Sequence, residues 1–295
     1  SMGIDPVRAV WDAVFMAISV FNNAGFVILP EGLSPHVTDW WMLIPIILGT
    51  TVGAIGFPVI MDVAKNLRTP RRWRLHTKLT LSTYLILAFV GALALALTEW
   101  NNPATLGAID TPSKILNAML AGVNSRSSGL SALDVGAMQT QTHFVQDILM
   151  MIGGGSASTA GGVKVTTFAV LVLAVIAEAR GDRDIETFGR RIPTSAVRLA
   201  VAVSLLGLAL VAVSVVLLLS MTSYSLDIIL FETASAFATV GLSTGITPIL
   251  PVGAKYVLIF LMFAGRTGSM TVAAALALRE RSRVIRMPEE RPIIG

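Results

Sequence analysis

The chain has 295 residues, of which 54% are hydrophobic and only 14% are charged, and its mean hydropathy is +0.74. A soluble domain of this size carries a more highly charged surface, so the composition excludes an ordinary soluble protein. Cysteine is absent, which excludes a disulfide framework and any thiolate metal site. The net charge of +4 would suit nucleic acid, but the placement of the basic residues, described below, argues against that partner.

Three apolar stretches are each long enough to form a membrane-crossing helix. They cover residues 79–98, residues 199–222 and, interrupted only by Arg266, residues 256–278. Because a helix rises 1.5 Å per residue, about 20 residues cross the hydrocarbon layer of a bilayer. The sequence therefore predicts a multi-pass integral membrane protein.

Most lysine and arginine residues lie in three clusters, each at one end of an apolar stretch. The clusters are Lys65, Arg68, Arg71, Arg72, Arg74 and Lys78; Arg180, Arg183, Arg190, Arg191 and Arg198; and Arg279, Arg281, Arg283, Arg286 and Arg291. The polar segments between them are poor in basic residues, so the positive-inside rule predicts that all three clusters lie in the cytoplasm. Positive charge at helix ends favours membrane lipid headgroups as partners, and not nucleic acid.

One order of elements recurs three times along the chain. A short helix too short to span the membrane is followed by a loop around one glycine, an apolar helix with a glycine-rich interruption, and a basic cluster. The short helices are expected at residues 10–21, 111–121 and 226–237, the central glycines are Gly25, Gly129 and Gly241, and the interruptions lie at residues 53–58, 153–155 and 265–268. The predicted fold class is an all-α membrane protein of repeated helix–pore-loop–helix units, divided at residues 1–75, 76–192 and 193–295.

The glycine loops suit an ion pathway. Irregular backbone halfway through a membrane is tolerated only where protein or a water-filled cavity satisfies its polar groups. Carbonyl groups that face such a cavity replace the hydration shell of a cation, and the negative end of a short helix favours a cation nearby. A glycine is needed where the backbone turns to a positive φ. The alternative for each loop taken alone is a glycine that serves helix packing or a turn.

Several motifs resemble those of one transporter family. Residues 19–26 (SVFNNAGF) and 235–245 (SAFATVGLSTG) are similar to the second and fourth pore loops of the Trk/Ktr/HKT potassium transporters. Residues 153–167 (GGGSASTAGGVKVTT) resemble the intramembrane loop of that family, and residues 265–268 (GRTG) resemble its last pore-lining helix. The likeness covers nearly the whole chain, and the bacterial Ktr-type membrane subunit is the nearest form.

The resemblance implies potassium uptake across the bacterial inner membrane, through a pore made of four such units, by a protein that is not an enzyme. It implies a filter formed by Asn23, Ala24, Gly25, Ser128, Gly129, Thr239, Val240 and Gly241, with K⁺ at the three glycines. It also implies a homodimer of pore subunits, a separate cytoplasmic nucleotide-binding (RCK-type) regulatory ring, and no organic cofactor in this chain.

Gate residues are expected in the loop that follows residue 152. Its small residues cannot form a stable helix, so we expect the loop to lie beneath the filter and obstruct the pore. The candidates are Gly153, Gly154, Gly155, Ser156, Thr159, Gly161, Gly162, Lys164 and Arg266. An ionisable residue such as Lys164 at membrane depth is costly and is therefore a functional candidate. The alternatives are a passive helix break for the loop, and for Arg266 a structural role with backbone carbonyls or Glu232.

The chain departs from the family pattern in three places. The first unit and the opening crossing of the second are missing, so this chain alone is not expected to close a four-sided ring. The middle loop reads RSSGL at residues 126–130, where a Thr-Ala-Gly-Phe run after Arg126 is expected, and we expect Arg126 to brace that loop. Residues 155–158 (GSAS) lack a proline that some relatives carry.

Two other function classes compete with a cation pore. A membrane serine hydrolase would need a histidine on a later helix, and none follows His143. A secondary transporter of another solute would show inverted repeats around broken helices, whereas these repeats run in one orientation. Both alternatives are separable from the pore by flux measurements.

Overall fold

A computed structural model of the chain describes residues 6–268. The described part is built from helices, as predicted, with one short hairpin of two strands. The helices are α1 (Pro6–Phe21), α2 (Trp40–Ile55), α3 (Phe57–Lys65), α4 (Leu75–Glu99), α5 (Thr111–Asn124), α6 (Thr140–Met151), α7 (Val165–Arg180), α8 (Thr194–Met221), α9 (Leu226–Ala238) and α10 (Val252–Phe263). Short 3₁₀ turns cover Ser34–His36, Pro70–Arg72, Leu106–Ala108, Val135–Ala137 and Thr247–Ile249, a π-helical turn covers Ala264–Gly268, and the strands are β1 (Ile185–Thr187) and β2 (Arg190–Ile192).

Two helices of the described part, α4 and α8, are long and apolar enough to cross a membrane by themselves. They have 25 and 28 residues, which at 1.5 Å per residue gives lengths of about 37 and 42 Å. Helices α2 and α3 pass the same test as a pair, but the chain bends by 95° between them. The bend falls at Gly56, whose φ of 95° is rarely adopted by other residues, so the predicted interruption at residues 53–58 is confirmed.

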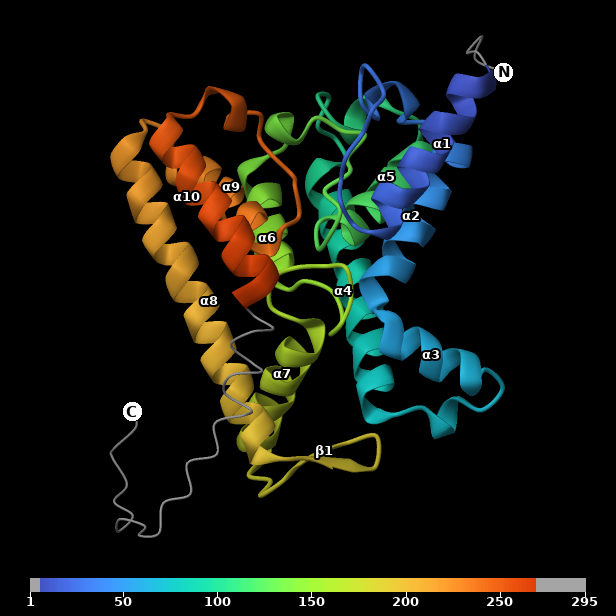
Figure 1. Ribbon diagram of the computed structural model, residues 1–295, viewed down its shortest axis with the longest axis vertical. Helices are drawn as coiled ribbons and strands as arrows, with labels where there is room; N and C mark the ends of the chain where they lie inside the picture. The colour runs from blue at the N-terminus through green and yellow to red at the C-terminus, as the bar shows by residue number, and fades with distance from the viewer. Residues whose placement is uncertain (1–5, 269–295) are drawn as a thin grey trace.

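The elements follow the order of the predicted repeat (Figure 1). In the second and third copies the long helices α4 and α8 each precede a short helix, α5 or α9, and the loop after it leads to the outgoing helix, α6 or α10. Helix α5 packs against α4 and also against α2 of the preceding unit, and α9 packs against α8 and also against α6. Each of these short helices therefore joins two units.

Buried apolar side chains form separate clusters at these junctions. One joins α1 to α2 and α5, another joins α4 to α6 and α9, and a third joins α8 to α9 and α10. Large apolar side chains also cover the outer surface of the long helices, among them Phe89 and Leu97 on α4 and Val216 on α8. An apolar exterior of this kind suits hydrocarbon as the surrounding solvent.

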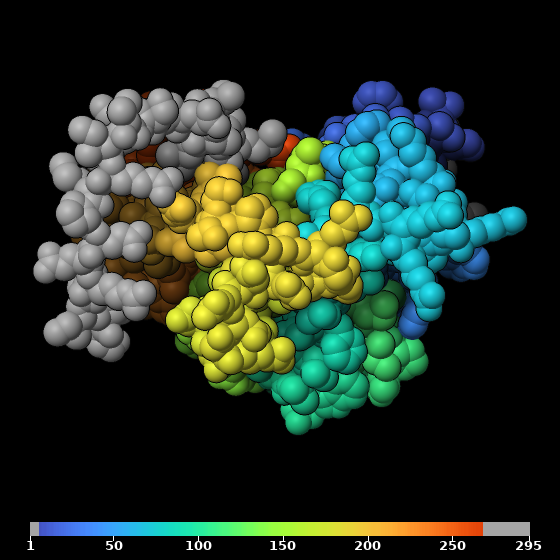
Figure 2. Space-filling view, turned by 90° about the horizontal axis from the view of Figure 1, so that it is seen from below, coloured from blue at the N-terminus to red at the C-terminus, as the bar shows by residue number. Residues whose placement is uncertain are grey.

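The two basic clusters of the described part lie at the same end of the molecule (Figure 1). One follows α3 and the other surrounds the β1–β2 hairpin. Seen from that end, the hairpin lies beside the segment that enters α4 (Figure 2), and the Lys78 ammonium is 5.8 Å from the centre of the Phe188 ring. This arrangement agrees with one cytoplasmic side for both clusters. The third cluster lies outside the described residues.

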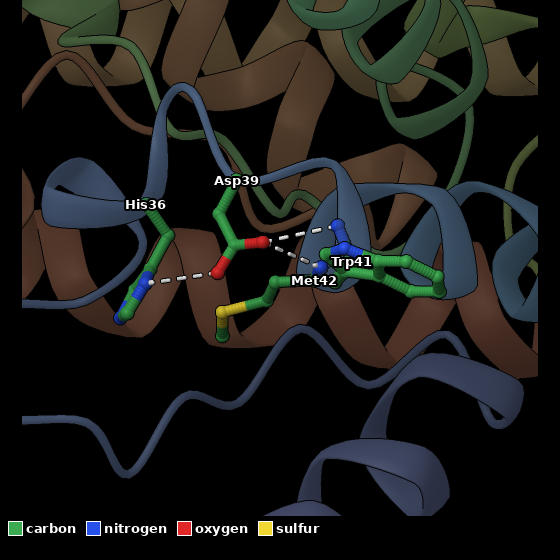
Figure 3. A network of polar contacts seen from close by, with 4 residues as sticks. All are labelled: His36, Asp39, Trp41 and Met42. Carbon is green, nitrogen blue, oxygen red and sulfur yellow. Dashed lines mark hydrogen bonds and ion pairs between the residues drawn. The ribbon is translucent and has the colours of Figure 1, made fainter. Parts of the chain in front are cut away.

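The opposite end of α2 is fixed by a cap (Figure 3). The Asp39 carboxylate accepts hydrogen bonds from the backbone N–H groups of Trp41 (3.0 Å) and Met42 (3.3 Å), and the Nδ1 atom of His36 lies 3.8 Å from its other oxygen. An acidic cap satisfies free N–H groups and suits the positive end of the helix dipole. The cap at Asp39 fixes where α2 begins.

Some helix limits differ from those predicted. Helix α1 begins at Pro6 instead of residue 10, and α5 continues to Asn124. Helix α10 ends at Phe263 and Arg266 lies in the π-helical turn that follows it, which confirms the predicted interruption at residues 265–268. The backbone of this turn packs closely on α9, since a Cβ on Gly265 would lie 1.6 Å from the carbonyl oxygen of Phe237. The rest of the predicted crossing, after residue 268, lies outside the described residues.

Candidate ion pathway

Each short helix ends in a loop whose backbone enters the left-handed region. The φ angles are 52° and 73° at Asn23 and Gly25, 72° and 58° at Ser128 and Gly129, and 51° and 96° at Thr239 and Gly241. This conformation is costly for residues with a side chain, so its occurrence in all three loops marks a constrained backbone. The three glycines that the sequence analysis selected therefore occupy comparable turns.

The three loops meet although they are far apart in the chain. A Cβ on Gly25 would lie 2.2 Å from the carbonyl oxygen of Ser128, and a Cβ on Gly129 would lie 2.3 Å from the carbonyl oxygen of Val240. The first loop thus lies against the second, and the second lies against the third. Both contacts are between backbones, which leaves no room for any side chain at the two glycines.

The third glycine differs from the other two. A Cβ on Gly241 would meet no described atom within 4 Å, although its φ of 96° also favours glycine. The first loop also approaches the third, since a Cβ on Gly25 would lie 3.8 Å from the carbonyl oxygen of Val240. The space beside Gly241 is open.

Arg126 supports the middle loop from behind. Its side chain is fully buried, its guanidinium donates a hydrogen bond of 2.9 Å to the carbonyl oxygen of Tyr84, and it lies 3.9 Å from the centre of the Tyr84 ring. The hydrogen bond and the cation–π contact together tie the loop to α4. This geometry agrees with the bracing role expected for Arg126.

Glu232 holds the segment that follows the third loop. Its carboxylate accepts hydrogen bonds from the Ser243 hydroxyl (2.7 Å), the Thr244 backbone N–H (2.8 Å) and the Thr247 hydroxyl (2.7 Å). The pairing of Glu232 with Arg266, one alternative from the sequence, is wrong: the Glu232 carboxylate binds residues 243–247, and the Arg266 guanidinium donates to the Thr159 carbonyl. The sequence signal that could have revealed this role is a glutamate within an otherwise apolar short helix.

Glu99, the last residue of α4, is a second buried glutamate whose carboxylate binds neighbouring segments. The carboxylate is fully buried and accepts hydrogen bonds from the Thr105 hydroxyl (2.6 Å) and the Gln139 backbone N–H (2.8 Å), as well as from Thr142. Gln139 precedes α6, so Glu99 joins the outer ends of the incoming and outgoing helices of its unit. The sequence analysis did not identify this residue.

The predicted gate loop lies in the middle of the molecule, between α6 and α7 in the chain (Figure 1). Backbone hydrogen bonds hold both its ends: Gly153 N–H donates to Val163 (2.7 Å), and Gly155 N–H donates to Ala54 at the end of α2 (2.8 Å). A Cβ on Gly161 would lie 2.1 Å from the Thr239 hydroxyl oxygen. The loop is therefore packed directly against α2 and against the third glycine loop, the one around Gly241.

Thr159 brings the gate loop to the first filter loop. Its hydroxyl accepts a hydrogen bond of 2.6 Å from the Asn23 side-chain amide, and it lies 3.1 Å from the Gly53 carbonyl oxygen, to which it donates. Its backbone carbonyl accepts a hydrogen bond from the Arg266 guanidinium. Arg266 thus does pair with a backbone carbonyl, as one alternative held, and that carbonyl belongs to the gate loop.

Lys164 is the second cation on this loop. It is 9% exposed, and its ammonium donates a hydrogen bond of 2.6 Å to the Ala160 carbonyl oxygen. The hydroxyls of Ser156 and Thr166 lie 3.0 Å apart. A cavity of about 440 Å³ adjoins Ser156, Ala157 and Lys164 between α7 and α8. The loop is therefore held by two cations and has empty space beside it.

The oxygen atoms at the converging loops are uncharged, and such oxygens can replace water around a cation. The described residues contain no group of three or more His, Asp or Glu side chains that would hold a metal ion. The oxygens near the filter glycines come from backbone carbonyls and hydroxyls, which carry no full charge. Uncharged oxygens suit an ion that must be released again, whereas a cage of carboxylates would hold a divalent ion tightly.

Comparisons with known proteins give a consistent result. The family model described as "Cation transport protein" (TrkH) matches residues 1–285. The chain is 39% identical over 283 residues to the Ktr system potassium uptake protein B of Bacillus subtilis (strain 168), which covers 96% of this chain and 63% of that protein. It is 34% identical over 284 residues to the protein of the same name from Vibrio alginolyticus, covering 96% of this chain and 62% of that protein.

Two further comparisons extend this set. The potassium/sodium uptake protein NtpJ of Enterococcus hirae is 34% identical over 295 residues, covering 98% of this chain and 65% of that protein. The crystal structure of the potassium transporter TrkH from Vibrio parahaemolyticus matches with a TM-score of 0.70 at 16% identity, covering 95% of this chain and 66% of that one. The chain spans less than two thirds of the length of the relatives it matches.

Proposed function

Because the chain belongs to the cation transport protein (TrkH) family, we propose that it lines a pore for potassium uptake across the inner membrane of a bacterial cell. Gly25, Gly129 and Gly241, with the residues just before them, would form the selectivity filter. K⁺ is the cargo of this pore, and no organic cofactor takes part.

The meeting of the three glycine loops is the observation that carries this proposal. Their backbones touch at Gly25 and Ser128 and again at Gly129 and Val240, in the interior of a helical membrane protein. Helices α1, α5 and α9 all end at these loops, so the negative ends of three helix dipoles lie near one place. A cation that loses water there gains both carbonyl oxygens and a favourable field.

The second part of the proposal concerns the gate. The loop of residues 152–164 touches two filter loops, through Asn23 and Thr239, and is bonded to Arg266 and Lys164 through its own carbonyls. A loop in this position would obstruct the pathway until those contacts are released. The cavity between α7 and α8 offers room for part of the displacement.

Assembly is a further part of the proposal. The printed name of the relatives places them in a Ktr system, and we propose that this chain likewise works with a separate cytoplasmic nucleotide-binding ring and as a homodimer. The basic segments near α3 and the β1–β2 hairpin present a cytoplasmic face that such a ring would contact. The open side of Gly241 would receive a further pore unit.

Cation flux tests the proposal. The full-length protein is reconstituted in liposomes, and K⁺-dependent uptake of a tracer is compared between the wild type and Gly241→Asp, which places a carboxylate at the filter. Gly181→Asp is the matched control, because Gly181 also has a positive φ (73°) and open space around it but lies at the end of α7. We expect Gly241→Asp to abolish uptake and Gly181→Asp to retain it.

The competing classes give different results in the same vesicles. Exchange of an organic solute without cation current would indicate a secondary transporter, and turnover of a substrate without flux would indicate a membrane enzyme. Growth of a potassium-uptake-deficient bacterium on low potassium gives an independent check, since only a pore or carrier for K⁺ restores it.

A further inference from the structure

One side chain connects the filter to the gate loop without an intermediate. Asn23 lies two residues before Gly25, and its amide donates a hydrogen bond of 2.6 Å to the hydroxyl of Thr159. The two residues are 136 positions apart in the sequence, so only the fold brings them together. The Thr159 hydroxyl in turn reaches two acceptors, the carbonyl oxygens of Gly53 on α2 (3.1 Å) and of Phe21 at the end of α1 (3.3 Å), so it lies between the first loop and α2.

The surroundings of Asn23 make this contact costly to lose. Asn23 is 4% exposed, and within the described residues Thr159 is the one hydrogen-bond partner of its side chain, while its amide oxygen has none. A buried polar group left unpaired carries its full desolvation cost. If the gate loop moves away, the Asn23 side chain must find another partner, and the backbone next to Gly25 must adjust with it.

The other two loops lack this hydrogen bond. Thr239 occupies the same position relative to Gly241 and touches Gly161 closely, but within the described residues its hydroxyl has no hydrogen-bond partner. Ser127 occupies that position in the middle loop, and its buried hydroxyl likewise has none. The polar connection between filter and gate is therefore confined to one of the three described loops.

We propose that the Asn23–Thr159 hydrogen bond couples the filter to the gate loop, so that ion occupancy at the Gly25 loop and the position of the gate loop depend on each other. This inference rests on the proposed functions of the two loops. Asn23 and Thr159 act here as positioning residues. Because such coupling is reciprocal, an ion that binds the filter must change the opening of the loop by the same factor as opening changes its binding.

The chain offers a direct reporter of loop position because it contains no cysteine. A Ser158→Cys variant places a thiol next to Thr159, at a half-buried position, after any cysteine that the full-length protein carries elsewhere has been replaced by serine. Its rate of modification by a membrane-impermeant thiol reagent is measured in inside-out vesicles that contain the full-length protein, in K⁺ and then in Na⁺. This rate reports loop opening and does not require any ion to be transported.

Three variants are made in that background. Asn23→Gly removes the side-chain amide, and glycine readily adopts the φ of 52° at this position. Thr159→Val removes the hydroxyl at similar volume. Thr159→Ser keeps the hydroxyl and removes only the methyl group. Ser127→Ala is the matched control for a filter-loop hydroxyl that does not bond to the gate loop. The double variant Asn23→Gly/Thr159→Val tests whether the two side chains act through one contact.

We expect the labelling rate to differ between K⁺ and Na⁺ in the reference protein and in Thr159→Ser and Ser127→Ala. Asn23→Gly and Thr159→Val should each raise the rate by roughly two- to tenfold, the worth of one hydrogen bond, and remove the ion dependence. The double variant should exceed neither single one. Equal rates in K⁺ and Na⁺ in the reference protein, ion dependence that survives in Asn23→Gly, or additive effects would each overturn the coupling. Failure of the pore itself would appear separately, as absent K⁺ flux in the wild type.

Discussion

The carbonyl oxygen of Ser128 occupies the space that a side chain on Gly25 would need, since a Cβ there would lie 2.2 Å from it. The obstacle is backbone, which cannot rotate away as a side chain can. The residue also has a φ of 73°, so its backbone conformation and its neighbour both favour glycine. The two loops can therefore touch only because Gly25 has no Cβ atom.

Gly25→Ala should reduce potassium uptake by roughly tenfold or more, because a left-handed alanine costs about 1–3 kcal/mol and the contact with Ser128 must open as well. Uptake is measured in a potassium-uptake-deficient strain and normalised to the amount of protein in the membrane. Gly32→Ala is the control, since Gly32 has a φ of 64° with nothing within 4 Å of a Cβ. Equal losses in both variants would assign the effect to backbone strain and not to the filter contact.

Arg126→Met should lower the thermal stability of the purified protein and weaken selectivity for K⁺ over Na⁺. The substitution removes a hydrogen bond and a cation–π contact from a fully buried site, together worth about 2–4 kcal/mol. Stability is followed by the melting of the detergent-solubilised protein, and selectivity by competition of Na⁺ with tracer uptake.

Tyr84 provides the control for that experiment. Tyr84→Phe keeps both the aromatic ring and the backbone carbonyl that Arg126 contacts, so it should change stability by less than about 1 kcal/mol. Tyr84→Leu removes the ring and should resemble a mild form of Arg126→Met. A neutral Arg126→Met would show that the loop does not depend on this brace.

The repeat was readable from the sequence because each copy carries a short helix, one glycine and a later glycine-rich break. Such breaks can be recognised in a sequence because their backbone requires glycine, as the φ of 95° at Gly56 shows. The hairpin at Ile185–Ile192 was missed because each strand has only three residues, and Glu186, Arg190 and Arg191 among them are charged. Phe188 and Gly189, both with positive φ, are the only local signal for its turn.

The candidate site was predictable only in part, for a physical reason. The filter glycines and the gate loop are local motifs, and both were selected. The contacts that arrange them, such as Asn23 with Thr159, join residues far apart in the chain and follow from packing. The same holds for Glu232, whose partners at residues 243–247 are reached only after the chain has turned through the third loop.

Glu232→Ala should loosen the segment after the third loop and lower K⁺ selectivity more than it lowers total flux. The carboxylate accepts hydrogen bonds from Ser243, Thr244 and Thr247, and hydrogen bonds to a charged group are worth about 1.5–3 kcal/mol. Competition of Na⁺ with tracer uptake is the measurement. Glu232→Gln retains an acceptor oxygen and should have an intermediate effect, whereas an alanine variant with unchanged selectivity would contradict the role.

Lys164→Met should increase potassium flux in the absence of any activating partner. The Lys164 ammonium donates to the Ala160 carbonyl within the gate loop and so stabilises the conformation in which the loop packs. A charged hydrogen bond in a buried site is worth about 1.5–3 kcal/mol, or roughly ten- to a hundredfold in an equilibrium. Methionine keeps most of the side-chain volume, so the loop should keep its packing and lose only the charge and the donor. Lys255→Met is the matched control, because Lys255 also donates to a carbonyl, that of Pro248, but far from the gate loop. Tracer uptake into liposomes measures both. If Lys164 serves only to fill space beside α7, flux in Lys164→Met will equal that of the wild type, and the loop must then be held by Arg266 and Thr159 alone.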